Sequence, residues 1–284
     1  MSTVTVGTLD VPGAQLRHET RGSGPPLLLI HGGGGDAEGM ALLAEQLAGR
    51  FTVIGYDRRG CGSSPLTTEP VGDADYLRAN ADDAALLLAA LGTGPAHVLG
   101  SSSGAVVALE LLVRHPDAVA TVVAHEPPVV TLLPDAAERI AFFDQVRRVH
   151  REQGLEAAMR LHLAAIGIDL PERPADLPAD LPPSALARLE RFRANQEYWL
   201  LHEVDPVVRY VPDLEALRAR RAQLVPAGGR ESRDQYPYWP NQVIAARLGL
   251  TVVDLPGDHI GYVPHPVEFA AGLTELLAVT GDRR

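Results

Sequence analysis

Three short motifs of this chain combine residue types that can carry out nucleophilic catalysis. The first is Gly100-Ser101-Ser102-Ser103-Gly104, which follows the apolar residues 96–99 and opens onto the apolar stretch 105–113. A serine at the centre of Gly-x-Ser-x-Gly lies on a sharp turn between strand and helix, because the flanking glycines let neighbouring backbone approach closely. Its hydroxyl group is then exposed at the top of a sheet. The motif therefore predicts that Ser102 is a nucleophile.

A run of glycines lies upstream, at the end of a predicted buried strand. Residues 26–30 are mostly apolar and lead into His31-Gly32-Gly33-Gly34-Gly35, whose histidine we expect to brace the turn. Glycines leave backbone N–H groups uncovered, and such a group can bind an oxyanion together with the N–H of Ser103, the residue after the nucleophile. We predict this role for Gly33 or Gly32. A phosphate-binding turn is the weaker alternative, because neither Gly-x-Gly-x-x-Gly nor Gly-Lys-Ser/Thr occurs here.

The third motif places a histidine near the C-terminus. His259 lies in Gly257-Asp258-His259, shortly after the β-like residues 250–254. A loop after the last strand supplies the histidine in triads whose order along the chain is serine, acid, histidine. Histidine suits this role because imidazole can take up and release a proton near neutral pH. We predict that His259 is the general base.

The carboxylate that would orient His259 has more than one candidate. It must accept the imidazole N–H and stabilise the imidazolium ion. Glu126 follows the apolar strand predicted at 119–124, and a charge at a largely buried strand end is costly unless it is paired. Glu231 and Asp234 follow the next predicted strand, in a stretch whose charges also suit a solvated turn. We predict Glu126 as the acid and keep Glu231 as the alternative.

These motifs are embedded in an alternation of strands and helices. Strands are predicted at 4–6, 15–20, 27–30, 51–56, 96–99, 119–124, 223–226 and 251–254. Helices are predicted at 40–47, 73–91, 102–114, 238–248 and 266–279. The strands from residue 27 onward should form a parallel sheet with right-handed connections. The pattern predicts an α/β protein with a mostly parallel, eight-stranded sheet flanked by helices.

One segment breaks this alternation. Residues 127–212 contain no convincing strand. Helices are predicted there at 135–153, 155–166 and 184–203, around a proline-rich segment at 170–183. We interpret the segment as a helical cap over the catalytic mouth, and a packed helical appendage is the alternative. Residues 1–126 and 213–284 then form the core domain.

The cap carries apolar and aromatic residues that suit either its own core or the wall of an apolar substrate pocket. These residues are Phe142, Phe143, Met159, Leu163, Phe192, Tyr198 and Trp199. Helical periodicity does not separate the two roles. We predict that Trp199, with one or two of the others, lines the pocket.

Composition argues against several classes of function. A formal net charge of −11 disfavours nucleic acid or an anionic membrane as a partner. All 25 basic residues are arginine, which rules out a Schiff-base lysine, a pyridoxal phosphate lysine and a P-loop lysine. The single cysteine, Cys61, rules out an internal disulfide and a cysteine-based metal cluster. The sequence shows neither a membrane span nor a signal peptide, so we expect a cytoplasmic protein.

The motifs together resemble those of the α/β-hydrolase superfamily, along essentially the whole chain. The matching residues are His31-Gly32-Gly33, Asp57-x-Arg59-Gly60-x-Gly62-x-Ser64, Gly100-x-Ser102-x-Gly104 and Gly257-Asp258-His259. The resemblance implies the α/β-hydrolase fold, with the cap inserted after the strand that follows the nucleophile helix. A serine at the turn argues against haloalkane dehalogenases and epoxide hydrolases, whose nucleophile at this position is aspartate.

Within the superfamily the chain is similar to the zearalenone lactonases, which open a resorcylic macrolactone. The similarity rests on residues 100–105, His125-Glu126-Pro127, residues 213–217, Tyr262-Val263-x-His265-Pro266 and Phe269-Ala270. In that group the triad acid is a glutamate after the strand that follows the nucleophile helix, which here is Glu126. The similarity implies a homodimer that uses neither a metal nor another cofactor.

The leading hypothesis is a cofactor-free serine hydrolase that acts on a small apolar ester or lactone. Ser102 attacks the carbonyl group, His259 takes the serine proton and Glu126 orients the histidine. The backbone N–H groups of Ser103 and Gly33 bind the oxyanion, and water then cleaves the acyl-enzyme. Two other hypotheses stay open. One is hydrolysis of a C–C bond in a diketone on the same fold, and the other is a non-catalytic receptor that binds a small lactone beneath the cap.

Overall fold

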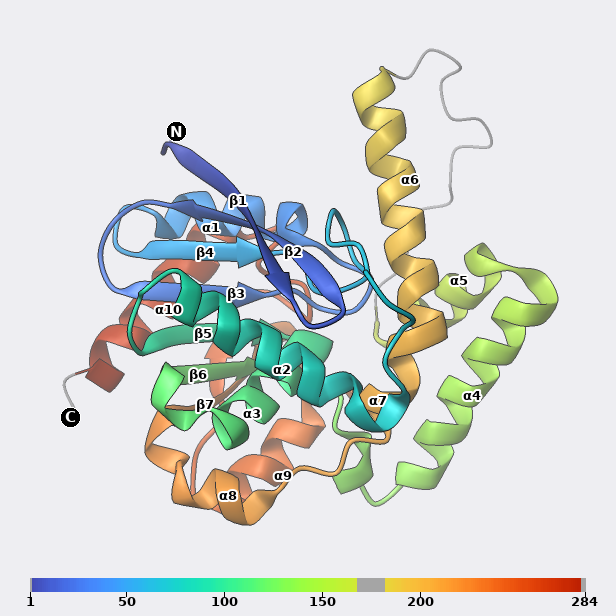
Figure 1. Cartoon of the computed structure of the whole chain (residues 1–284). Coiled ribbons are helices and arrows are strands. Elements are labelled where there is room, and N and C mark those ends of the chain that lie inside the picture. Colours follow the sequence, from blue (N-terminus) through green and yellow to red (C-terminus); the bar gives the residue numbers. More distant parts are fainter. Residues whose placement is uncertain (1, 168–181, 282–284) are drawn as a thin grey trace.

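Eight strands form one sheet in the computed structural model of this chain, which describes residues 2–167 and 182–281 (Figure 1). In chain order they are β1 (Val4–Val11), β2 (Ala14–Arg21), β3 (Pro26–Ile30), β4 (Thr52–Tyr56), β5 (Ala96–Ser101), β6 (Val119–His125), β7 (Leu224–Gly229) and β8 (Val253–Leu255). They lie side by side in the order β1-β2-β4-β3-β5-β6-β7-β8. The pairs β1–β2 and β2–β4 are antiparallel, and every pair from β3 to β8 is parallel. The predicted eight-stranded, mostly parallel sheet is confirmed.

Helices cover both faces of the sheet (Figure 1). One layer consists of α1 (Ala41–Leu47) and α10 (Pro266–Gly281), and the other of α2 (Asp73–Ala90), α3 (Ser103–Arg114), α8 (Leu214–Ala219) and α9 (Trp239–Leu248). Leu27 and Leu29 of β3 pack into the first layer, whereas Leu28 and Ile30 pack into the second. Successive side chains of a strand point to opposite faces, so a strand buried on both faces is apolar throughout.

The helices predicted for the cap lie between β6 and β7. They are α4 (Ala136–Gln153), α5 (Leu155–Ala165), α6 (Pro183–Tyr198), η4 (Trp199–Glu203) and α7 (Val204–Val208). The upper part of α6 stands away from the body of the molecule in Figure 1. Within the described residues of 127–212 there is no strand. Nearly all of the proline-rich segment predicted at 170–183 lies outside the described residues.

Several elements differ from the prediction, three of them near the proposed site or the cap. The helix predicted at 184–203 becomes a turn of π-helix in η4, where the N–H of Val204 donates to the carbonyl of Trp199, five residues earlier. The strand predicted at 223–226 continues to Gly229, because β7 also pairs with β8. Helix α8 was not predicted, although Asp213 caps it by accepting hydrogen bonds from two backbone N–H groups.

Candidate active site

Ser102 lies on the turn between β5 and α3, with φ of 53° and ψ of −122°. Both flanking glycines are required by close backbone contacts. A Cβ atom on Gly104 would collide with the carbonyl oxygen of Ile30 at the end of β3, and one on Gly100 would collide with the carbonyl of Gly104. The turn can therefore form only with these glycines. It places Ser102 directly before α3, whose first backbone N–H groups have no partner within the helix.

Glu126 lies behind His259 at the end of β6. Its Oε2 atom is 2.6 Å from Nδ1 of His259, and the carboxylate is fully buried. The Oε1 atom accepts hydrogen bonds from the N–H of Gly229 at 2.7 Å and from the hydroxyl of Ser232 at 2.6 Å. Both carboxylate oxygens are thus held in place. Since Nδ1 of His259 is bound to Glu126, Nε2 is the ring nitrogen left for another partner.

These contacts fix the charge of Glu126. Burial raises the pKa of the carboxyl group, but the hydrogen bond and charge of His259, with the hydroxyl of Ser232, outweigh it and hold the pKa at about 2. Glu126 is therefore ionised throughout the neutral range. A buried carboxylate in this state suits the orientation of an imidazole and the stabilisation of an imidazolium ion.

The alternative acid, Glu231, is exposed in the structure. Its backbone N–H donates to the carbonyl of Gly257 at 3.0 Å, so its main chain contacts the loop that carries His259. No contact joins the carboxylate of Glu231 to the imidazole of His259. Asp234 is exposed as well. The structure thus brings His259 to Glu126 and leaves the other two carboxylates at the surface.

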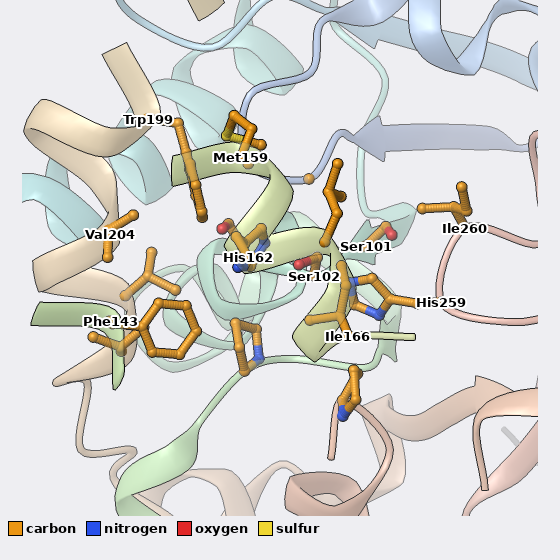
Figure 2. A pocket seen from close by; sticks show the side chains of 18 of the residues that line it. Ser101, Ser102, Phe143, Met159, His162, Ile166, Trp199, Val204, His259 and Ile260 are labelled. Atoms are coloured by element: carbon orange, nitrogen blue, oxygen red, sulfur yellow. The ribbon is translucent and has the colours of Figure 1, made fainter. Parts of the chain in front are cut away.

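One cavity of about 120 Å³ contains the predicted nucleophile, the predicted base and the predicted oxyanion residues (Figure 2). It lies between the carboxyl ends of the parallel strands and the helices of the cap. The predicted site residues among its lining are Gly32, Gly33, Ser102, Ser103, Trp199 and His259. Parallel strands end at the same edge of a sheet, so residues far apart in sequence meet there.

The helices between β6 and β7, which the sequence predicts to be a cap, supply most of the apolar wall of this cavity. Phe143, Met159, Leu163 and Trp199 line it, and three of these four also belong to the hydrophobic cluster of the cap itself. The two roles that the sequence left open therefore belong largely to the same residues. Phe192 is 55% exposed and takes neither role. Tyr198 packs against the core, where a Cβ atom on Gly60 would collide with its ring.

His162 also lines the cavity, a position that its immediate sequence context did not indicate (Figure 2). Its ring lies 4.6 Å from that of Trp199, and its Nδ1 atom is buried without a hydrogen-bond partner. Burial lowers the pKa of His162 to about 3, so the ring is neutral. The sequence did contain a signal that His162 lies beside the pocket residues, because Met159, His162 and Ile166 have the spacing of one helix face.

His31 braces the glycine loop, as the sequence suggested. The backbone N–H of Arg58 donates to Nε2 of His31 at 3.2 Å, so Nδ1 carries the proton and donates to the carbonyl of Gly32 at 2.8 Å. Burial, with the charge of Arg58, lowers the pKa of His31 to about 3. The imidazole is therefore neutral and structural.

The described residues give less support to catalysis by a thiol or by a metal ion. Cys61 is buried, and burial raises the pKa of its thiol to about 12, which disfavours the thiolate. Within residues 2–167 and 182–281, no group of three or more His, Cys, Asp or Glu side chains forms a potential metal site. No helix in the described part of the chain is long and apolar enough to cross a membrane.

Comparisons with known proteins agree with this fold. A family model for the alpha/beta hydrolase fold matches residues 25–151. The uncharacterized hydrolase YraK of Bacillus subtilis is 35% identical over 281 residues, which cover 97% of each chain. The chain belongs to the α/β-hydrolase family.

One further relative is named an esterase, and a carboxylesterase structure shares the fold. The pimeloyl-[acyl-carrier protein] methyl ester esterase of Chromobacterium violaceum is 42% identical over 101 residues, 36% of each chain. A carboxylesterase structure from Nitrososphaera gargenis shares the fold, with a TM-score of 0.70 at 21% identity; the match covers 98% of the hydrolase and 100% of the esterase.

Proposed function

We propose that this α/β-hydrolase is a serine esterase that works through an acyl-enzyme, with Ser102, His259 and Glu126 as its triad. The observation that carries the proposal is the 2.6 Å hydrogen bond between Nδ1 of His259 and the buried Glu126. It leaves Nε2 of His259 for the hydroxyl of Ser102, which lines the same cavity. This is the arrangement that activates a serine.

The reaction follows from these roles. Nε2 of His259 takes the proton of Ser102 as Oγ bonds to the carbonyl carbon of the ester. The resulting oxyanion is bound by the backbone N–H groups of Ser103 and of Gly33 or Gly32. His259 then gives the proton to the leaving alcohol, and a water molecule, deprotonated in turn by His259, releases the acid from Ser102. No step of this scheme requires a metal or an organic cofactor.

The lining of the cavity points to an uncharged, largely apolar substrate. Among the described residues that line it, none is Asp, Glu or Arg. A volume of about 120 Å³ is smaller than that of pockets for drug-sized ligands, roughly 300–1,000 Å³. Short-chain esters therefore fit best with the cap as it stands. The similarity to zearalenone lactonases extends the proposal to lactones, and a ring as large as zearalenone needs the cap to move.

We also propose the division of the chain that the sequence suggested. Residues 127–212 form a lid, which supplies Phe143, Met159 and Trp199 to the cavity, and residues 1–126 and 213–284 form the catalytic core. A homodimer is the assembly implied by the zearalenone lactonases. Sedimentation velocity of the purified protein tests this part of the proposal.

Replacement of the nucleophile tests the function. Ser102→Ala should retain the fold and lose nearly all turnover of p-nitrophenyl butyrate, because the oxyanion donors alone supply only a residual part of catalysis. A fluorophosphonate probe should label the native protein once, by intact mass, and leave Ser102→Ala unlabelled. Persistent labelling of Ser102→Ala would remove Ser102 from the mechanism.

The same assay separates the two other hypotheses. A receptor for a small lactone would bind the ester with at most one turnover, whereas an esterase continues over many turnovers. A C–C hydrolase would cleave a vinylogous diketone faster than a p-nitrophenyl ester. We expect sustained ester turnover that depends on Ser102.

A further inference from the structure

A buried ion pair joins the cap to the core beside the cavity. Arg58 follows β4, and Glu203 is the last residue of η4 in the cap; both side chains are completely buried. Nη2 of Arg58 is 2.7 Å from Oε1 of Glu203, and the hydroxyl of Tyr76 donates to the other carboxylate oxygen at 3.1 Å. The proposed triad uses none of these groups.

Arg58 also contacts the glycine loop of the proposed oxyanion hole. The same Nη2 atom donates to the carbonyl oxygen of Gly32 at 3.2 Å. That oxygen also accepts the Nδ1–H of His31 at 2.8 Å and the backbone N–H of Gly35 at 3.2 Å. Three donors thus hold one carbonyl group, and Arg58 additionally fixes the tautomer of His31 through its own backbone N–H.

The direction of this carbonyl determines the direction of the next N–H. In a trans peptide the C=O of one residue and the N–H of the next point in opposite directions, and the described chain contains no cis peptide. The N–H of Gly33 therefore points away from the three donors that hold the carbonyl of Gly32. Gly33 itself lines the cavity that contains Ser102.

The cap holds the loop from its other side. A Cβ atom on Gly33 would collide with the indole of Trp199, the first residue of η4, and one on Gly34 would lie within 2.5 Å of the amide of Gln196. The amide of Gln196 also donates to the carbonyl of Gly34 at 3.2 Å. The end of α6 and the π-helical turn thus lie directly on the glycine loop.

We propose that Arg58 and Glu203 are positioning residues for the oxyanion hole. Glu203 holds the guanidinium group, Arg58 holds the carbonyl of Gly32, and the peptide so fixed aims the N–H of Gly33 at the developing oxyanion. Because Glu203 belongs to the cap, the hole is complete only when the cap is in place. This inference rests on the proposed esterase function and adds two residues, neither of which touches the substrate.

A contribution to folding stability does not by itself explain why Arg58 and Glu203 form a buried ion pair. Taking two charges out of water is costly, and apolar residues of similar volume are often as stabilising as a buried ion pair. Removal of one partner is different, since it leaves an uncompensated buried charge. A double replacement can therefore separate a role in stability from a role in catalysis.

The experiment compares Arg58→Met, Glu203→Leu and the double variant Arg58→Met/Glu203→Leu with the native enzyme. Both single variants should melt at lower temperature, and the double variant should recover most of the loss. In all three, kcat for p-nitrophenyl butyrate should fall by about 10- to 100-fold with little change in KM, since one oxyanion donor is misaligned rather than removed. The Ki of a trifluoromethyl ketone, which forms an oxyanion on the serine, should rise in parallel.

A neighbouring ion pair provides a matched control. Arg59 binds Asp83 at 2.6 and 2.7 Å, and this pair is also buried but makes no contact with the glycine loop. Arg59→Met should lower the melting temperature and leave kcat of the folded enzyme unchanged.

Two outcomes would overturn the inference. If the double variant is folded and keeps the native kcat and Ki, the pair acts only in stability. If Arg59→Met lowers kcat as much as Arg58→Met does, the effect is general to buried charges. Failure of the proposed function would look different, because turnover of the native enzyme would then survive in Ser102→Ala.

Discussion

Ser102 has a backbone conformation that glycine would adopt more easily. Its φ of 53° lies in the region where a Cβ atom is strained, at a cost of roughly 1–3 kcal/mol. Ser102→Gly should therefore be more stable to urea than Ser102→Ala by about 1 kcal/mol, although both are inactive. Equal unfolding free energies for the two variants would mean that the turn stores no such strain.

The identity of the triad acid is decided by a pair of amide substitutions. Glu126→Gln retains the shape of the side chain but can stabilise the wrong tautomer of His259, an effect that costs about 10⁴-fold in kcat in serine proteases. Glu231→Gln changes an exposed carboxylate and should leave kcat close to native. Steady-state kinetics checks this, after circular dichroism has shown that both variants fold. If Glu231→Gln lowered kcat more than Glu126→Gln did, the triad acid would be Glu231, in the loop after β7.

Residue chemistry explains which parts of the site the sequence could indicate. Ser102 and His259 lie in short motifs whose spacing reflects a local turn, and Glu126 was favoured because an unpaired charge at a buried strand end is costly. The contact between Arg58 and Glu203 spans 145 positions. No local pattern of sequence reports such a contact, since it depends on where the cap lies.

At the scale of elements, α5 forms a wall of the cavity where a substitution should change the size of the substrate that fits. Met159 extends from α5 into the lining (Figure 2). Met159→Ala should enlarge the cavity and raise kcat/KM for p-nitrophenyl octanoate relative to the acetate by about tenfold. Each methylene group of the longer acyl chain that fits into the enlarged cavity adds to the preference for octanoate. Phe192→Ala is the control, since Phe192 is exposed on α6 and outside the lining. An unchanged ratio in Met159→Ala would show that the ester chain lies elsewhere.

The boundaries of elements were harder to predict than their type. Periodicity indicated one continuous helix over 184–203, whereas the structure has a π-helical turn from Trp199 to Glu203. A π-turn is stabilised by tertiary contacts, and it occurs often at functional sites. Here the turn begins at Trp199, which lines the cavity, and ends at Glu203, which binds Arg58. No local sequence pattern indicates either contact.

At the scale of the molecule, buried histidines should lower the stability in acid. Burial lowers the pKa of His125 to about 4 and those of His31 and His162 to about 3, from an ordinary value of 6.5. As the pH falls below 6.5 the unfolded chain binds protons that the folded chain does not bind, so the unfolding free energy decreases down to about pH 3–4. The protein should therefore lose stability progressively through this window.

His125→Leu tests this account. His125 is fully buried, packs edge-on against Phe269, and has no hydrogen-bond partner for either ring nitrogen. Its replacement should reduce the slope of unfolding free energy against pH by somewhat less than one proton, about 1 kcal/mol per pH unit, between pH 6 and 4.5. Urea unfolding at several pH values measures the slope, which does not depend on the packing change itself. An unchanged slope would mean that folding does not lower the pKa of His125.

The fold as a whole was more predictable than the site. Apolar strands alternating with amphipathic helices leave few arrangements other than a parallel sheet covered on both faces. The sequence also marked residues 127–212 as an exception to this alternation. It did not indicate which apolar residues of this segment line the cavity, because residues such as Phe143 and Trp199 belong both to the segment's own cluster and to the cavity wall.

The contact between Trp199 and Gly33 limits how this enzyme can be altered by evolution or design. Exchanging Trp199 would reshape the binding space and loosen the glycine loop at once, so a gain in substrate range would be coupled to a loss in rate. The three atoms nearest to a Cβ atom placed on Gly33 belong to Trp199 and Ser103, and those nearest to one on Gly34 all belong to Gln196. New specificities should therefore arise first at Met159 and Leu163 of α5 and at Ile166 directly after it, while the end of α6 stays constant.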